Sequence, residues 1–180
     1  MSKSRLKLLI LDASEVIHLH EFGLWDRLIG LCDVHLARTV VDFEANFFEK
    51  DGDSHSIDLG DDIAEGRVRV FEVSLQEIAR FRDRFDPVYV EALDPGEAEA
   101  LAHLVQSPES FSISSGDAIV YRVLGRLGLG DQGLSLEEVL RKVGLGRSQL
   151  PWACQKKFRE KYTKEGEIDA IQGKGLKRST

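Results

Sequence analysis

Short apolar runs separated by amphipathic stretches organise this chain. Residues 7–11 (KLLIL) form a nearly continuous apolar run, which is typical of a strand buried on both faces of a parallel sheet. In residues 67–73 (RVRVFEV) apolar and polar positions alternate, as expected for a strand with one covered face. Two further short segments complete the predicted strands, namely residues 33–37 and 111–114.

Helical spacing and capping signals fill the intervals between these strands. The segments SLQE at Ser74, DPGE at Asp94 and SLEE at Ser135 each pair a capping side chain with a glutamate three residues later, the pattern of a capping box. Thr39 is placed to cap a helix whose apolar side includes Phe43 and Phe47. The predicted helices cover residues 14–20, 24–31, 39–48, 74–85, 94–105, 118–128, 135–143 and 148–164.

The order of these elements predicts the fold class. Strands that alternate with helices form a mainly parallel central sheet between helical layers, so we expect an α/β fold, a three-layer α/β/α sandwich. The polar segment 50–66 is predicted to be a loop. The polar, glycine-containing end of the chain, residues 165–180, is predicted to fray.

Charge divides the chain in two. The whole chain of 180 residues carries a formal charge of −7, but residues 151–180 hold eight Lys and Arg against four Asp and Glu, a net charge of +4. We therefore expect a single domain over residues 1–145 and a basic helical extension over 146–180. The acidic body excludes a protein that binds nucleic acid only by neutralising phosphates. The charge distribution remains compatible with two other functions. Carboxylates could be gathered to bind a metal ion, and the basic C-terminal end could bind a polyanion.

The basic extension contains a candidate RNA-binding stripe. Lys156, Lys157 and Arg159 stand among aromatic residues, an arrangement in which bases stack and cations contact phosphates. The same spacing also suits Trp152 and Phe158 packing back onto the body while the lysines stay solvated. We favour this second interpretation.

Cysteine content and hydropathy indicate where the protein works. Cys32 and Cys154 are too few for a disulfide framework, which favours a reduced, cytoplasmic setting. No run approaches the roughly 18 apolar residues of a membrane span. The apolar run after the basic start ends at Asp12, too early for a secretory signal. We therefore expect a cytoplasmic protein without membrane association.

Four carboxylates fall at positions where an α/β fold gathers ligands. Asp12 directly follows the first predicted strand and Asp117 follows the last, and parallel sheets bind ligands at the carboxyl ends of their strands. Glu44 lies among apolar residues of a predicted helix, and Glu97 lies in the first turn of another. Taken singly, each acid is explained by a turn, a solvated helix face, a capping box or a helix cap. Their joint placement at one sheet edge favours a metal site.

Four segments also resemble a known family, and they read LLILDASEVI (8–17), RTVVDFEA (38–45), PGEAEALAHL (95–104) and SISSGDAIVYRVLGRLGL (112–129). In this order and spacing they resemble the PIN domain family of metal-dependent nucleases, in particular the PIN-like branch whose third motif reads GEAEA. The first and last segments are the most specific. Arg38 replaces the proline that often opens the second motif, and residues 145–180 fall outside the match.

The resemblance implies roles for the four acids. Asp12, Glu97 and Asp117 would bind the main Mg²⁺ or Mn²⁺, hard cations that carboxylate oxygens suit. Glu44 would complete a second metal site or orient the attacking water. A cation also relieves the repulsion among acids held close together.

Hydroxyl side chains and partners complete what the resemblance implies. The hydroxyl that usually stands before the family's fourth acid corresponds to Ser114 or Ser115, and we expect Ser14 and Ser115 to orient ligands or substrate. The implied activity is that of an endoribonuclease that hydrolyses RNA phosphodiester bonds. The implied setting is the toxin half of a bacterial toxin–antitoxin pair, with a small antitoxin protein as partner and a homodimer as assembly.

Two functions of other kinds stay open. One is a PIN-like protein-binding module without appreciable nuclease activity, and the other, less favoured, is a phosphatase-like hydrolase of small phosphate esters. A nuclease should gain thermal stability from Mn²⁺, because binding to the folded state raises stability, whereas a protein-binding module should gain little.

Overall fold

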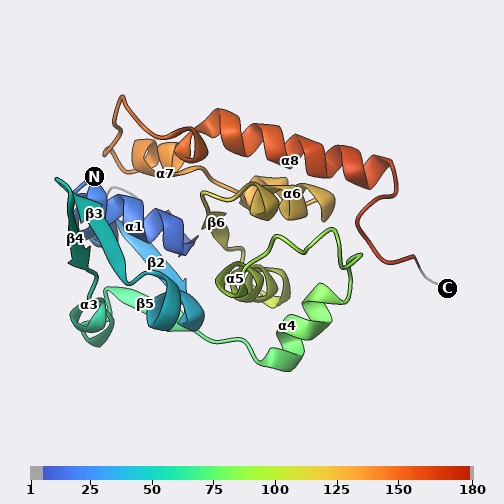
Figure 1. The fold of residues 1–180 in the computed structure, drawn as a ribbon, viewed down its shortest axis with the longest axis horizontal. Helices are drawn as coiled ribbons and strands as arrows, with labels where there is room; N and C mark the ends of the chain where they lie inside the picture. Colours follow the sequence, from blue (N-terminus) through green and yellow to red (C-terminus); the bar gives the residue numbers. More distant parts are fainter. Residues whose placement is uncertain (1–5, 179–180) are drawn as a thin grey trace.

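A four-stranded parallel sheet forms the centre of the molecule, with its strands in the order β5-β2-β1-β6 (Figure 1). The structure is a computed structural model that describes residues 6–178. All three strand pairings are parallel, and each strand falls on a segment predicted from its apolar pattern. The strands are β1 (Leu6–Leu11), β2 (Cys32–Ala37), β5 (Val68–Phe71) and β6 (Ser112–Ser114).

Helices flank this sheet, so the expected mixed α/β architecture with a parallel sheet is confirmed (Figure 1). Helices α2 and α5 pack on β2, α4 packs on α5, and α8 packs along α6. The helices are α1 (Ala13–Glu21), α2 (Trp25–Leu31), α3 (Gly60–Ala64), α4 (Leu75–Arg82), α5 (Pro95–Gln106), α6 (Ala118–Arg126), α7 (Leu136–Lys142) and α8 (Lys156–Ile171). Single turns occur at η1 (Val40–Glu44), η2 (Gly130–Gln132) and η3 (Trp152–Cys154).

The three predicted capping boxes are present and begin α4, α5 and α7. In each, the side chain of Ser74, Asp94 or Ser135 accepts a hydrogen bond from a backbone N–H three residues later, and the glutamate there bonds back to the cap. These reciprocal bonds satisfy N–H groups that the first helical turn leaves without partners. Local sequence therefore sets where these helices begin.

The helix predicted over 39–48 is confirmed only as far as Glu44, and the loop predicted over 50–66 is wrong. The chain makes one π-helical turn, η1, and then forms an antiparallel hairpin of β3 (Phe47–Lys50) and β4 (Asp53–Ser56), followed by α3. The Thr39 side chain makes no capping bond. Asp51 and Gly52 form the turn with φ of +54° and +84°, the conformation that an Asp-Gly pair favours in a two-residue hairpin.

This hairpin changes the position of two aromatic side chains. Phe43 and Phe47, expected on the apolar side of a helix, are 74% and 62% exposed. Phe43 immediately precedes Glu44, so an exposed aromatic ring stands beside one of the candidate acids.

The C-terminal part of the chain does not fray where the sequence predicted. Helix α8 continues to Ile171, and its backbone approaches α6 so closely that a Cβ atom added at Gly125 would lie 2.1 Å from the Thr163 carbonyl oxygen. A Cβ at Gly166 would lie 2.0 Å from the Arg122 carbonyl oxygen. Small residues on both helices therefore permit this contact. The boundary proposed between residues 1–145 and 146–180 stays a prediction.

None of the helices within residues 6–178 combines the length and the apolar character that crossing a lipid bilayer requires.

Candidate metal centre

Two of the candidate acids reach the same sheet edge from neighbouring strands. Asp12 directly follows β1 and caps α1, with its Oδ1 accepting a hydrogen bond of 2.7 Å from the Ala13 N–H. Asp117 follows β6 and precedes α6. Because β1 and β6 are paired in parallel, their carboxyl ends place both carboxylates at one edge. The backbone ties the two strand ends together, since the Asp12 N–H donates to the Ser114 carbonyl at 3.0 Å.

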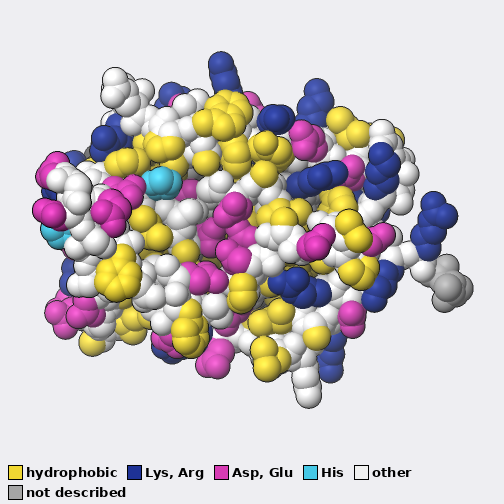
Figure 2. All heavy atoms as spheres, in the orientation of Figure 1, with side chains coloured by type: hydrophobic (Ala, Val, Ile, Leu, Met, Phe, Trp, Pro, Cys, Tyr) yellow, Lys and Arg dark blue, Asp and Glu magenta, His cyan; other side chains and the backbone are white. Residues whose placement is uncertain are grey.

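Glu97 joins these two acids from α5. One carboxylate oxygen of each of Asp12, Glu97 and Asp117 lies within 4.8 Å of the others. Asp12 is 3% exposed and Glu97 1%, whereas Asp117 is exposed. Figure 2 shows Asp and Glu side chains gathered at the middle of the drawn face, with Lys and Arg toward its right-hand side. Two of the three carboxylates are thus buried and one is exposed.

Glu97 serves the helix and the acidic cluster at the same time. Its Oε2 accepts a hydrogen bond of 3.1 Å from the Asp94 N–H and so closes the capping box of α5. Its Oε1 is buried without a hydrogen-bond partner within residues 6–178. An unpaired buried carboxylate oxygen is costly, and a cation at the cluster would satisfy it.

Two hydroxyls hold the acids in place, at the positions where the sequence suggested ligand-orienting groups. The Ser115 hydroxyl donates to Asp12 Oδ2 at 2.9 Å and accepts from the Asp117 N–H at 3.0 Å. The Ser14 hydroxyl lies 3.4 Å from the same Asp12 oxygen and accepts from the Gly116 N–H at 3.0 Å. Asp12 and the start of the Asp117 loop are thus positioned together.

Glu44 is not among the carboxylates gathered within 4.8 Å, but it lies beside the helix that supplies Glu97. Its Oε1 accepts a hydrogen bond of 3.0 Å from the Gly96 N–H, and its Oε2 is buried without a partner in the described part of the chain. A Cβ atom at Gly96 would come within 2.1 Å of that Oε2. The absence of a side chain at Gly96 therefore leaves room for the Glu44 carboxylate.

The buried acids of this region have raised pKa values. Burial, with the charges of Asp94 and Asp117, raises the pKa of Asp12 to about 7 against the opposing hydrogen bonds from Ser115 and Ala13. Burial, followed by the charge of Asp12, raises the pKa of Glu97 strongly. Burial and the charge of Asp94 also raise the pKa of Glu44. Proton or cation binding removes this repulsion.

The sequence analysis missed two acids of this region. Glu15 is fully buried on α1, and neither of its carboxylate oxygens has a hydrogen-bond partner within residues 6–178. Burial and the charges of Asp12 and Asp117 raise its pKa to about 8. Asp94 acts through its charge on Asp12, Glu44 and Glu97 in addition to capping α5. The signal for Glu15 was its place one helical turn after Asp12, next to the buried Val16.

The candidate RNA-binding stripe on α8 is partly engaged in other contacts. The Arg159 guanidinium binds the Glu138 carboxylate through two hydrogen bonds of 2.6 and 2.9 Å. The Lys156 ammonium lies 3.4 Å from a Glu160 oxygen, and Lys157 is exposed. Phe158 is buried and its ring packs edge to face with that of Tyr121. The favoured interpretation, an aromatic residue packed back onto the body, is confirmed for Phe158, whereas Trp152 stays half exposed.

The donor set suits a hard divalent cation. Carboxylate oxygens with room for water on the exposed side are the ligands that Mg²⁺ and Mn²⁺ prefer. Comparison of the chain with models of protein families, with curated proteins and with solved structures finds no match. The resemblance to the PIN domain family therefore stays a prediction, and the function is argued from the site.

Proposed function

We propose that this protein is a ribonuclease with a PIN-like fold that hydrolyses RNA phosphodiester bonds with Mg²⁺ or Mn²⁺. One observation carries the proposal, the convergence of Asp12, Glu97 and Asp117 within 4.8 Å at the carboxyl edge of a parallel sheet. These acids come from three separate elements, and local helix capping does not explain why their free oxygens point at one another. In this proposal the protein is a toxin that a small antitoxin protein restrains, and it assembles as a homodimer.

In the proposed reaction each side chain has a separate task. A bound divalent ion supplies charge stabilisation for the phosphodiester and lowers the pKa of a water molecule. The buried carboxylates of Asp12 and Glu97 and the exposed carboxylate of Asp117 would hold this ion. Glu44, fixed by the Gly96 N–H, accepts a hydrogen bond from the attacking water and thereby orients it.

The serine hydroxyls preorganise this site rather than react. Because the Ser115 hydroxyl bonds both to Asp12 and to the Asp117 backbone, the two ligands keep one relative position with and without substrate. Ser14 fixes the intervening loop through the Gly116 N–H. Such positioning lowers the reorganisation that a reaction requires.

RNA cleavage tests the proposal. We expect the purified protein to cleave RNA with Mn²⁺ or Mg²⁺, and we expect EDTA or Asp12→Asn to abolish cleavage while the far-ultraviolet circular dichroism spectrum stays unchanged. If Mn²⁺ gives neither cleavage nor a higher melting temperature, the protein-binding module is the better account. Hydrolysis of small phosphate monoesters but not RNA would favour a phosphatase.

A further inference from the structure

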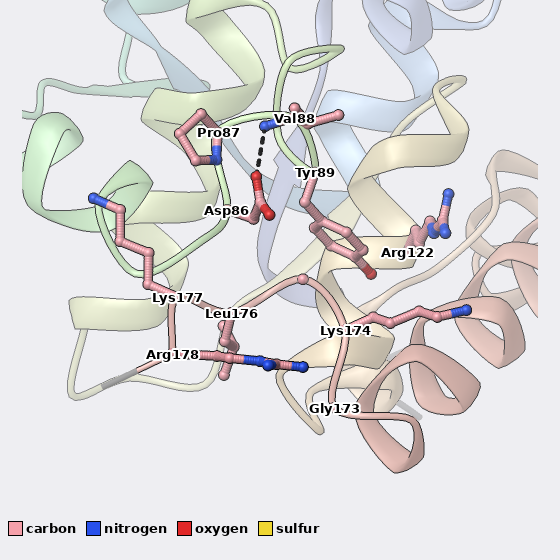
Figure 3. A pocket seen from close by; sticks show the side chains of 11 residues that line it. Asp86, Pro87, Val88, Tyr89, Arg122, Gly173, Lys174, Leu176, Lys177 and Arg178 are labelled. Carbon is pink, nitrogen blue, oxygen red and sulfur yellow. Dashed lines mark hydrogen bonds between the residues drawn. The ribbon is translucent and has the colours of Figure 1, made fainter. Parts of the chain in front are cut away.

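A basic cavity lies apart from the acidic cluster, between a loop, α6 and the residues that follow α8. Its volume is about 710 Å³ (Figure 3). One wall is the loop 86–89 with the Tyr89 ring, another is Arg122 of α6, and the third is the segment 173–178. In Figure 3 the Arg178 side chain runs across the space within the arc of this segment, and the Lys174 side chain extends outward from the arc below Arg122. Only the wall formed by residues 173–178 belongs to the part of the chain that lies outside the resemblance.

Backbone contacts hold this segment in a fixed position. The Asp86 N–H donates to the Gly175 carbonyl at 2.8 Å, and the Lys177 N–H donates to the Arg84 carbonyl at 3.1 Å. Gly175 has φ of +90°, and a Cβ atom there would lie 2.8 Å from the Tyr89 ring. The terminal segment is thus an ordered wall, and its cations are presented at defined positions.

Part of the positive charge around the cavity is neutralised within the protein. The Arg122 guanidinium donates to Asp169 Oδ2 at 2.7 Å, and the Tyr89 hydroxyl donates to the same oxygen at 2.8 Å. The Lys177 ammonium lies 3.5 Å from Asp83 Oδ1. These pairs shape the wall but leave little net charge.

Two cationic side chains of the cavity are not paired with an acid in the described part of the chain. Lys174 and Arg178 are exposed and form no ion pair with an acid within residues 6–178. Arg126 donates through its Nε to the Lys174 carbonyl and adds a further cation beside the cavity. Asp86 is the acid of the lining, and its Oδ1 accepts from the Val88 N–H. In a chain with a formal charge of −7, the lining of this cavity holds four cationic side chains and one carboxylate.

The cavity and the acidic cluster lie along one helix. Asp117 stands directly before α6, and Arg122 and Arg126 follow on that helix. With about 1.5 Å of rise per residue, Arg122 lies about 8 Å and Arg126 about 14 Å beyond Asp117 along the axis. The two sites are thus separated along α6 by about one and a half to two and a half helical turns.

From this arrangement we infer that the cavity binds a backbone phosphate of the RNA strand outside the bond that is cleaved. Lys174 and Arg178 make the contact, and the paired Arg122 and Tyr89 form the wall behind it. The inference rests on the proposed function, because it names how the substrate of that site is held. Phosphate contacts of this kind position a strand without reading its sequence.

RNA affinity and its salt dependence test this inference. The full chain carrying Asp12→Asn is titrated into a fluorescent single-stranded oligonucleotide, with and without the added pair Lys174→Ala and Arg178→Ala. We expect the pair to weaken binding about tenfold and to reduce the slope of log K against log salt by about 0.7, the contribution of one phosphate contact to a single strand. The melting temperature of each protein shows whether it is folded.

The control pair is Lys142→Ala with Lys164→Ala, two exposed lysines of α7 and α8 that do not line the cavity. It removes the same charge, and we expect it to leave both affinity and slope unchanged. Equal effects of the two pairs, or no effect of Lys174→Ala with Arg178→Ala, would overturn the inference.

Hydrolysis of bis(4-nitrophenyl) phosphate by the wild type separates this inference from the nuclease proposal. That diester has a single phosphate, so it offers no second phosphate for the cavity to bind. If it is hydrolysed with Mn²⁺ while the cavity variants bind RNA as the wild type does, only the cavity assignment fails. If neither it nor RNA is hydrolysed, the nuclease proposal fails, and the cavity assignment, which depends on it, fails as well.

Discussion

Without metal, the Asp12→Asn variant should be more stable than the wild type. With Mn²⁺ bound to the wild type, the variant should be the less stable of the two. Asparagine keeps the oxygen that caps α1 and removes the buried negative charge. Burial raises the pKa of Asp12 from 3.8 to about 7. At about 1.4 kcal/mol for each pKa unit, the ionised carboxylate costs the folded state up to about 4 kcal/mol above pH 7.

The pH dependence of this cost has a definite sign. Because the pKa of Asp12 is higher in the folded than in the unfolded chain, the folded protein binds more protons between about pH 4 and pH 7. The stability that this proton contributes is fully present below about pH 4 and is lost as the pH rises through 7. The advantage of Asp12→Asn should therefore be up to about 4 kcal/mol near pH 8 and only about 2 kcal/mol near pH 5.

Thermal unfolding measures this prediction. In EDTA near pH 8 we expect Asp12→Asn to melt up to roughly 8–16 °C above the wild type, at about 2–4 °C for each kcal/mol in a chain of this size. Saturating Mn²⁺ should raise the melting temperature of the wild type and leave the variant unchanged. Asp131→Asn, at an exposed acid outside the cluster, should match the wild type throughout. The reasoning is refuted if Asp12→Asn in EDTA melts at or below the wild type near pH 8.

Two further predictions concern glycines at close contacts. Gly96→Ala places a Cβ against Glu44 Oε2 and should reduce RNA cleavage about a hundredfold with little change in melting temperature, because the end of a flexible side chain moves rather than the backbone; unchanged cleavage would remove Glu44 from the reaction. Gly125→Ala presses on the Thr163 carbonyl and should lower the free energy of unfolding in urea by about 2–3 kcal/mol, whereas Gly30→Ala in α2, with open space around it, should raise it by about 0.5–1 kcal/mol. Equal effects of these two alanines would contradict the close approach of α6 and α8.

Local signals predicted the parts of the fold that local forces determine. The buried strand at 7–11 and the capping boxes at Ser74, Asp94 and Ser135 depend on neighbours in sequence, and the structure has them. The prediction for 39–48 failed after Glu44 because the aromatic residues suggested that the helix continues, while the Asp-Gly pair that closes a hairpin was not weighed. The length of α8 failed for another reason, since it depends on contact with α6 that no local pattern reports.

The candidate site was likewise predictable from the sequence only in part. Asp12 and Asp117 follow strands, so a parallel sheet was enough to expect them together. The double role of Glu97 required the direction of each carboxylate oxygen, which only the structure provides. Glu15 lies among the core positions of α1, where an acid is unexpected without knowledge of what it faces.

The bond between Ser115 and Asp12 joins residues 103 positions apart, and it has a consequence for how the protein is made. Contacts between such distant residues are slow to form, because a long loop must close first. During synthesis the chain cannot assemble its acidic cluster until β6 has left the ribosome and taken its place beside β1. No N-terminal fragment released earlier holds the complete cluster, so the proposed activity appears only in chains whose central sheet has closed.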